Sequence, residues 1–176
     1  MRNRVQMMQG EARFVDQHVL EVTEDSGDIH QVRGSRIVIA VGTRPHRPDN
    51  VPFNGVTVVD SDGMTRLGRL PNSLAVIGAG VIGVEYATIF SALDVRVTLI
   101  EPRDTFLDFV DRELMSEFVY QLRDRGVSFR LGDKVQSIDM EVGQPVVMLE
   151  GGRRVRAEMV LYTAGRVGAT DTLDLE

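Results

Sequence analysis

Residues 76–90, VIGAGVIGVEYATIF, constrain the fold more than any other part of this sequence. Gly78, Gly80 and Gly83 have the spacing G-x-G-x-x-G, and they follow the apolar run SLAVI at 73–77. From Gly80 onward the apolar residues recur at helical intervals. The stretch therefore predicts a buried strand, a tight glycine turn and a helix, which together open a βαβ unit.

Each glycine of this motif has a physical role in a turn that binds a dinucleotide. Gly78 allows the tight turn, Gly80 lets a pyrophosphate approach the backbone, and Gly83 lets helix and strand pack closely. The helix N-terminus adds unpaired N–H groups and the positive end of a dipole, both of which favour phosphate. Because the spacing also fits an ordinary strand-to-helix turn of an α/β protein, the surrounding residues have to decide between the two.

The residues after the motif continue the alternation of strand and helix. We predict strands at 95–101, 127–131 and 159–165, a helix that Asp111 caps and Gly126 ends, and a hairpin of 146–150 with 153–158. The pattern predicts an α/β fold: a Rossmann-like βαβαβ parallel sheet with an added β-hairpin or meander.

The N-terminal part reads as β-rich. We predict short strands at 4–10, 18–23 and 29–33, then a strand at 36–41, RIVIAV, whose nearly unbroken apolar run indicates burial on both faces. Residues 44–71 contain four of the six prolines and are expected to have little regular structure.

An internal similarity suggests that this N-terminal part is the remnant of a second nucleotide-binding domain. Residues 31–45 and 154–168 share the order strand, short polar step, apolar strand, glycine, arginine. Chance similarity between two such strands is the alternative. The expected domains are a partial β-rich domain at 1–45, a connector at 46–71, a nucleotide-binding domain at 72–166, and a return toward the first domain at 167–176.

Two acidic residues and one basic residue bear on which nucleotide is bound. Glu101 ends the second strand, where a carboxylate accepts hydrogen bonds from a ribose diol and repels a 2′-phosphate, so it predicts NAD(H) over NADP(H). Arg103 either pairs with that phosphate or is a solvated loop charge. Glu85 either complements the helix dipole or accepts a hydrogen bond from the nicotinamide carboxamide.

Composition removes several classes of function. The chain has no cysteine, which excludes disulfides, thiolate metal sites and thiol nucleophiles within it. A net charge of −6 argues against nucleic acid as a partner, and no stretch is apolar enough to span a membrane. The three histidines lack the spacing of a metal site, and we identify no catalytic nucleophile–base pair. A cytoplasmic location is expected.

The order and spacing of four segments make the chain resemble the flavoprotein disulfide reductase family. These segments are IAVGTRP at 39–45, LPNSLAVIGAGVIGVEYATIF at 70–90, VTLIEPRDTFL at 97–107 and VLYTAGRVGATDTLDLE at 160–176. Within the family, EYATIF, DTFLDFVDREL and the C-terminal segment are most similar to the transhydrogenases. Dihydrolipoamide dehydrogenases also resemble it, but they usually have Leu-Pro where this chain has Leu107-Asp108.

The resemblance implies that the full-length protein is an FAD enzyme that transfers hydride between NADPH and NAD. It also implies that this full-length protein is a homo-oligomer and that its partners are small-molecule nucleotides. It implies that NAD(P) contacts fall on Gly78, Ala79, Gly80, Val81, Ile82, Gly83, Val84, Glu85, Glu101, Val135 and Gly165. From its position after Glu101, we add Arg103 to these candidates. Residual FAD contacts would be Ala12, Val41, Gly42 and Thr43. The family's flavin glycine loop, redox-active segment and dimer domain have no counterpart here, so we expect a fragment that is inactive alone. A dihydrolipoamide dehydrogenase fragment and a non-catalytic nucleotide-binding module remain alternatives.

Overall fold

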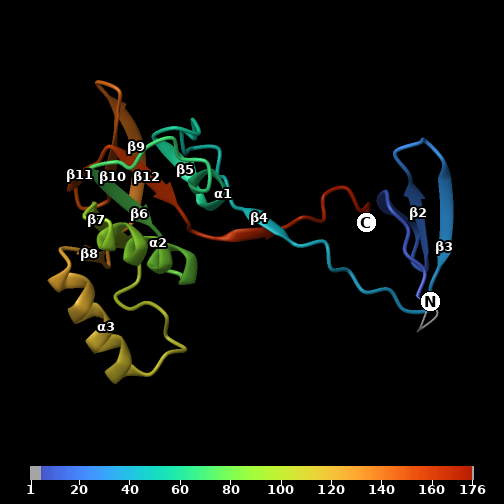
Figure 1. Ribbon diagram of the computed structural model, residues 1–176, viewed down its shortest axis with the longest axis horizontal. Helices are drawn as coiled ribbons and strands as arrows, with labels where there is room; N and C mark the ends of the chain where they lie inside the picture. Colours follow the sequence, from blue (N-terminus) through green and yellow to red (C-terminus); the bar gives the residue numbers. More distant parts are fainter. Residues whose placement is uncertain (1–4, 176) are drawn as a thin grey trace. The chain divides into compact units, whose positions relative to one another are not determined.

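The computed structural model describes residues 5–175, which divide into two compact units. The first unit comprises residues up to Arg44 together with the segment from Val167 onward, and the second comprises Pro45–Arg166. Figure 1 shows the elements of each unit. The short strands β4 (Thr43–Pro45) and β13 (Arg166–Gly168) pair with each other, and the division between the units falls within both of them.

The second unit is built on a five-stranded parallel sheet with the order β5-β12-β6-β7-β8. Two long helices connect the strands on one side of β6, and β12 returns to the other side. The strands are β5 (Val58–Asp60), β6 (Ser73–Ile77), β7 (Arg96–Glu101), β8 (Ser128–Leu131) and β12 (Met159–Tyr162). The helices are α1 (Ser61–Met64), α2 (Val81–Ala92) and α3 (Arg112–Asp124). The predicted Rossmann-like α/β arrangement is thus confirmed.

Alternation along the strands divides the core into two layers, because successive side chains of a strand point to opposite faces. Leu74, Val76 and Leu99 face α2 and α3, where Ala87 and Leu122 complete one cluster. The opposite face of the sheet, which includes Ala75, Ile77, Ile100 and Val160, packs on Ile138, Val147 and Leu149 of an antiparallel sheet. That sheet comprises β9 (Val135–Glu141), β10 (Gln144–Leu149) and β11 (Arg154–Arg156).

Local signals explain why α2 and α3 begin where they do. Asp111 accepts hydrogen bonds from the amides of Glu113 and Leu114, which caps α3 as predicted. At α2 the first residue outside the helix is Gly80, and no side chain caps that end. Within residues 5–175, the amino end of α2 therefore keeps N–H groups that no side chain caps.

The first unit contains an antiparallel sheet of β1 (Glu11–Asp16), β2 (Val19–Thr23) and β3 (Ile29–Arg33). The predicted strand at 4–10 is wrong over its described part, since the ladder of β1 with β2 begins at the Glu11–Thr23 pair. Its first residue, Arg4, lies outside the described residues. The predicted strand at 36–41 is also wrong: within residues 5–175 no segment pairs with it, and Val38 is 88% exposed.

Two more differences concern residues 44–71 and β9. The segment predicted to have little regular structure contains β5 and α1, and the side chains of β5 are buried in the parallel sheet. β5 has only three residues, too few for alternation to reveal it. β9 was not predicted either.

Among the described residues, no helix has both the length and the apolar character needed to cross a bilayer.

Candidate functional site

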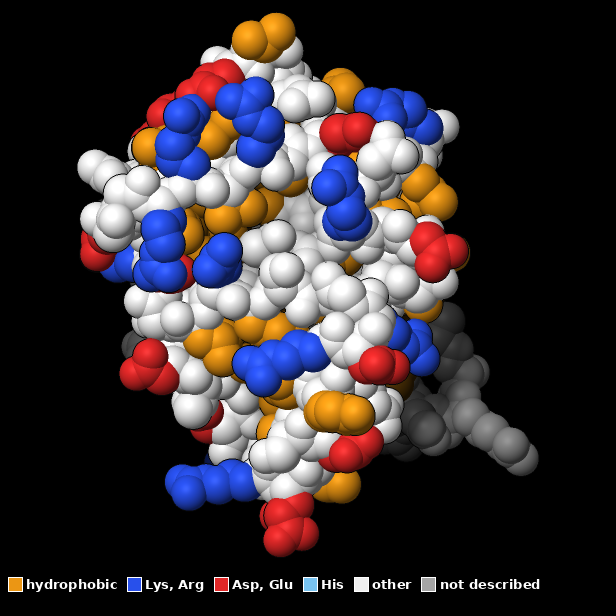
Figure 2. Space-filling view, turned by 90° about the vertical axis from the view of Figure 1, so that its left-hand side faces the viewer, with side chains coloured by type: hydrophobic (Ala, Val, Ile, Leu, Met, Phe, Trp, Pro, Cys, Tyr) orange, Lys and Arg blue, Asp and Glu red, His pale blue; other side chains and the backbone are white. Residues whose placement is uncertain are grey.

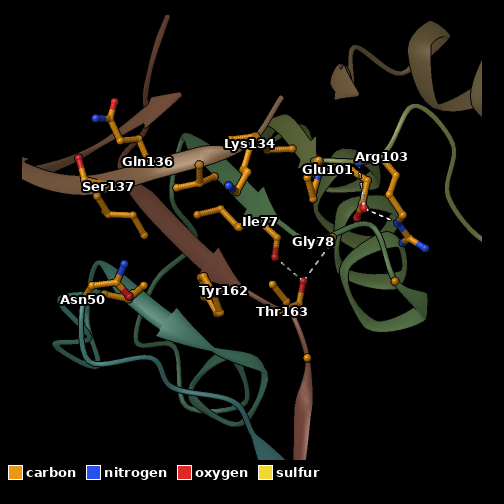
Figure 3. A pocket seen from close by; sticks show the side chains of 18 residues that line it. Asn50, Ile77, Gly78, Glu101, Arg103, Lys134, Gln136, Ser137, Tyr162 and Thr163 are labelled. Atoms are coloured by element: carbon orange, nitrogen blue, oxygen red, sulfur yellow. Dashed lines mark hydrogen bonds and ion pairs between the residues drawn. The ribbon is translucent and has the colours of Figure 1, made fainter. Parts of the chain in front are cut away.

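A cavity of about 450 Å³ opens at the carboxyl ends of the parallel strands in the second unit. Figure 3 shows residues of β6, β7, β9 and β12 converging on it. In open parallel sheets ligands bind at this edge, where the strand order changes direction, and here that point lies between β6 and β12. The lining residues are Asn50, Val51, Ile77, Gly78, Gly80, Ile100, Glu101, Pro102, Arg103, Lys134, Val135, Gln136, Ser137, Ile138, Tyr162, Thr163, Ala164 and Gly165.

The glycine turn forms one wall of this cavity, and two of its glycines are required by close packing. Gly78 has a φ of +99°, and an added Cβ there would lie 3.0 Å from the backbone of Thr163 and Ala164. At Gly83 a Cβ would lie 1.9 Å from the carbonyl oxygen of Gly78. Thr163 stabilises the same turn, because its hydroxyl donates to the carbonyl oxygens of Ile77 (2.9 Å) and Gly78 (3.0 Å) (Figure 3).

Gly80 differs from these two glycines, because it leaves space open toward the cavity. A Cβ at Gly80 would meet no atom within 4 Å, although its backbone, with φ −72° and ψ 179°, is accessible to any residue. The empty space adjoins the uncapped N-terminus of α2, whereas Asp60 caps α1 and Asp111 caps α3. Free amides and the positive end of a helix dipole next to open space fit a bound phosphate.

Glu101 lies at the end of β7 and is buried, with 4% of the residue exposed. The amide of Ala79 donates to its Oε2 (2.8 Å), and Nε of Arg103 donates to its Oε1 (2.6 Å). Burial raises the pKa of Glu101, but the bonds from Arg103 and Ala79 outweigh it and hold the pKa below its ordinary value. The residue is therefore an ionised acceptor. Its Oε1 also accepts from the backbone amide of Arg103 (3.4 Å), so Oε2 is the oxygen that keeps a second lone pair for a ligand hydroxyl.

Two cations stand at the rim of the cavity, and each is paired with an acid. Figure 3 shows Arg103 on one side of Glu101 and Lys134 on the other. The hydrogen bond and charge of Glu101 raise the pKa of Arg103, and those of Glu150, whose Oε1 lies 2.8 Å from Nζ of Lys134, raise that of Lys134. On the face drawn in Figure 2, basic side chains likewise stand among acidic and apolar ones.

The structure brings six of the twelve predicted nicotinamide-nucleotide residues into the cavity lining. These are Gly78, Gly80, Glu101, Arg103, Val135 and Gly165. The other six belong to the turn or to α2 and do not line it: Ala79, Val81, Ile82, Gly83, Val84 and Glu85. Glu85 is exposed on α2. Ala79 contributes indirectly, through its amide bond to Glu101.

Sequence reasoning missed much of the remaining wall. Gln136, Ser137 and Ile138 belong to β9, and Asn50 and Val51 to the segment before β5. No motif marks these positions. Lys134, the only lysine in the chain, carried no spacing signal either. The buried strand at 159–165 was predicted, but not that Tyr162 would line a cavity at its end.

The residues expected to retain flavin contacts all belong to the first unit. Ala12 is half-buried in β1, where it pairs with Val22. Val41, Gly42 and Thr43 are exposed, and Gly42 has a φ of +76°. These flavin contacts stay a prediction.

Comparison with known proteins places the chain in a family of oxidoreductases. The family model described as pyridine nucleotide-disulphide oxidoreductase matches residues 1–176. Soluble pyridine nucleotide transhydrogenases of Mycobacterium tuberculosis and Pseudomonas aeruginosa are 46% and 40% identical to the chain over 99% of its length. The chain spans only 38% of the length of these relatives.

Solved structures of other proteins share the fold of this chain. The HOCl-induced flavoprotein disulfide reductase RclA of Escherichia coli aligns over 95% of the chain with a TM-score of 0.77 and 31% identity. LpdA of Mycobacterium tuberculosis aligns over 97% with a TM-score of 0.86 and 23% identity. In each case the chain covers 38% of the solved protein.

Proposed function

Because the chain belongs to the pyridine nucleotide-disulphide oxidoreductase family, we propose that its cavity binds the nicotinamide nucleotide of an FAD-dependent enzyme that transfers hydride between NADPH and NAD. The chain is 46% identical to proteins named soluble pyridine nucleotide transhydrogenase, which supports this reaction over others in the family. The chain covers 38% of those proteins, so the reaction is proposed for the longer protein, of which this chain supplies the nucleotide site.

One arrangement carries the proposal. The uncapped N-terminus of α2, the open space at Gly80 and the buried carboxylate of Glu101 border the same cavity. A dinucleotide needs an anion site for its pyrophosphate and, beside it, an acceptor for a ribose diol. Val135 and Gly165 lie on the remaining wall, and we expect both to contact the same ligand.

When bound, nicotinamide and flavin supply the hydride chemistry, and the protein orients them and excludes water. The residues of this chain then have binding roles. The amides of the α2 N-terminus hold the diphosphate, and Glu101 accepts hydrogen bonds from the ribose hydroxyls. Arg103 offsets part of the charge of Glu101, which lets a 2′-phosphate approach at a reduced cost.

We predict that the chain binds NADH about tenfold more tightly than NADPH and that Glu101→Ala narrows this difference. The ionised carboxylate repels a 2′-phosphate, and its removal abolishes that repulsion. The measurement is a calorimetric titration of the 176-residue chain with each nucleotide. Glu101→Gln is the matched variant, since it removes the charge but keeps an acceptor for the Ala79 amide. Equal affinities of the unmodified chain for the two nucleotides would refute this role of Glu101.

A further inference from the structure

The segment 46–53, here called the strap, forms part of the cavity wall without being a helix or a strand. It contributes Asn50 and Val51 to the lining. Its backbone bonds are few: His46 donates to Gly165 (3.1 Å), Val51 to Pro48 (3.1 Å) and Phe53 to Val51 (2.9 Å). A segment of this kind keeps one position only if side chains hold it.

An ion pair between a buried acid, Asp60, and an exposed arginine, Arg47, anchors one end of the strap. Asp60, at the end of β5, is 1% exposed. Its Oδ1 accepts from the amide of Gly63 (2.8 Å), which caps α1, and its Oδ2 accepts from Nε of Arg47 (2.5 Å). Burial raises the pKa of Asp60, but the bonds from Arg47 and Gly63 outweigh this and lower it below its ordinary value. A buried carboxylate is costly without a partner, so the pair fixes the position of Arg47.

Two ring contacts connect this anchor to the cavity. The guanidinium carbon of Arg47 lies 5.2 Å from the centre of the Phe53 ring. Phe53 in turn meets Tyr162 edge to face, with the ring centres 5.8 Å apart and the planes at 84°. Such cation–π and edge-to-face contacts have preferred geometries, so each one restricts the orientation of the next group. Tyr162 lines the cavity at the end of β12 (Figure 3).

We propose that Arg47 is a positioning residue for the nucleotide: through Asp60 and Phe53 it holds the strap against β12 and so fixes the wall formed by Asn50, Val51 and Tyr162. Arg47 itself does not line the cavity, so it acts through these residues. The inference rests on the proposed nucleotide site. It assigns a role to Asp60 and Arg47, which belong neither to the glycine motif nor to the surroundings of Glu101.

The test uses the double variant Arg47→Met/Asp60→Asn in the full 176-residue chain. Arg47→Met alone leaves the Asp60 charge buried without its partner and is expected to lower the melting temperature. The double variant removes both charges while the Asp60→Asn side chain can still cap α1, so its melting temperature is expected to return to near that of the unmodified chain. We expect the double variant to bind NADH about tenfold more weakly than the unmodified chain. We also expect faster deuterium uptake at residues 46–53 than in the unmodified chain. A role in stability alone predicts that affinity recovers together with the melting temperature.

The control is Arg69→Met, which removes an exposed arginine paired with Glu158 at the amino end of the sheet. It is expected to change neither NADH affinity nor exchange in the strap. If the double variant matches the unmodified chain in affinity and in deuterium uptake, the inference is wrong while the proposed function stands. If the unmodified chain binds neither NADH nor NADPH, the proposed function fails, and this inference fails with it.

Discussion

Replacing Gly83 with alanine is expected to destabilise the protein by about 3 kcal/mol and to lower its melting temperature by roughly 6–12 °C. The new Cβ would lie 1.9 Å from the Gly78 carbonyl oxygen and 2.7 Å from Oγ1 of Thr163. Because the Gly78 oxygen is a backbone atom in a turn that Thr163 holds, the amino end of α2 would have to move away from β6. Thermal unfolding followed by circular dichroism measures the effect.

The direction of the change in stability caused by Gly83→Ala distinguishes a crowded position from an open one. In a helix with open surroundings, the same substitution would stabilise by about 1 kcal/mol, since alanine has the higher helix propensity. Gly80→Ala is the internal control, because its Cβ would meet nothing within 4 Å. A melting temperature of Gly83→Ala equal to or above that of the unmodified chain would contradict the close contact between α2 and the turn.

Gly80→Ala is expected to have the opposite profile: it should weaken NADH binding by at least about tenfold while the melting temperature stays within about 2 °C. Its backbone angles suit alanine, so the fold has no reason to change. The added methyl group would occupy the space beside the α2 N-terminus, where the pyrophosphate has to approach the amides. The affinity is measured by calorimetric titration with NADH.

A second measurement separates binding from folding in this variant. Saturating NADH should raise the melting temperature of the unmodified chain, because a ligand that binds only the folded state stabilises it. The shift should be smaller for Gly80→Ala at the same NADH concentration. Unchanged affinity would show that the nucleotide does not place its pyrophosphate at this end of α2.

The sequence allowed prediction of those elements whose signals are local. Strands β6 and β7 and helix α2 follow from apolar runs and from the glycine motif. The start of α3 follows from Asp111, whose side chain forms the cap that its position predicted. Glu101 was recognised because its distance from the motif is fixed by the length of the intervening helix and strand. Its contact with the Ala79 amide was not predicted, since that depends on how the turn folds back.

Features that depend on distant partners were not predictable in this way. Residues 36–41 have the composition of a buried strand, but composition does not say whether a neighbouring strand exists. Conversely, β5 is too short to be recognised alone and is a strand because β12 pairs with it. The cavity wall at Asn50 and Tyr162 also joins segments that are apart in sequence: Arg47 pairs with Asp60, and Phe53 contacts both Arg47 and Tyr162.

The position of β12 in the sheet has a consequence for how the chain acquires its structure during synthesis. β12 is the last strand of the parallel sheet to be translated, yet it lies between β5 and β6. Until residues 159–162 leave the ribosome, β5 has no partner and the apolar edge of β6 stays open. Pairings between such distant segments form slowly, and open strand edges attract other chains. The nascent chain therefore keeps unpaired strand edges, and with them a risk of misassembly, until β12 arrives, although most of the sheet's residues have by then been made.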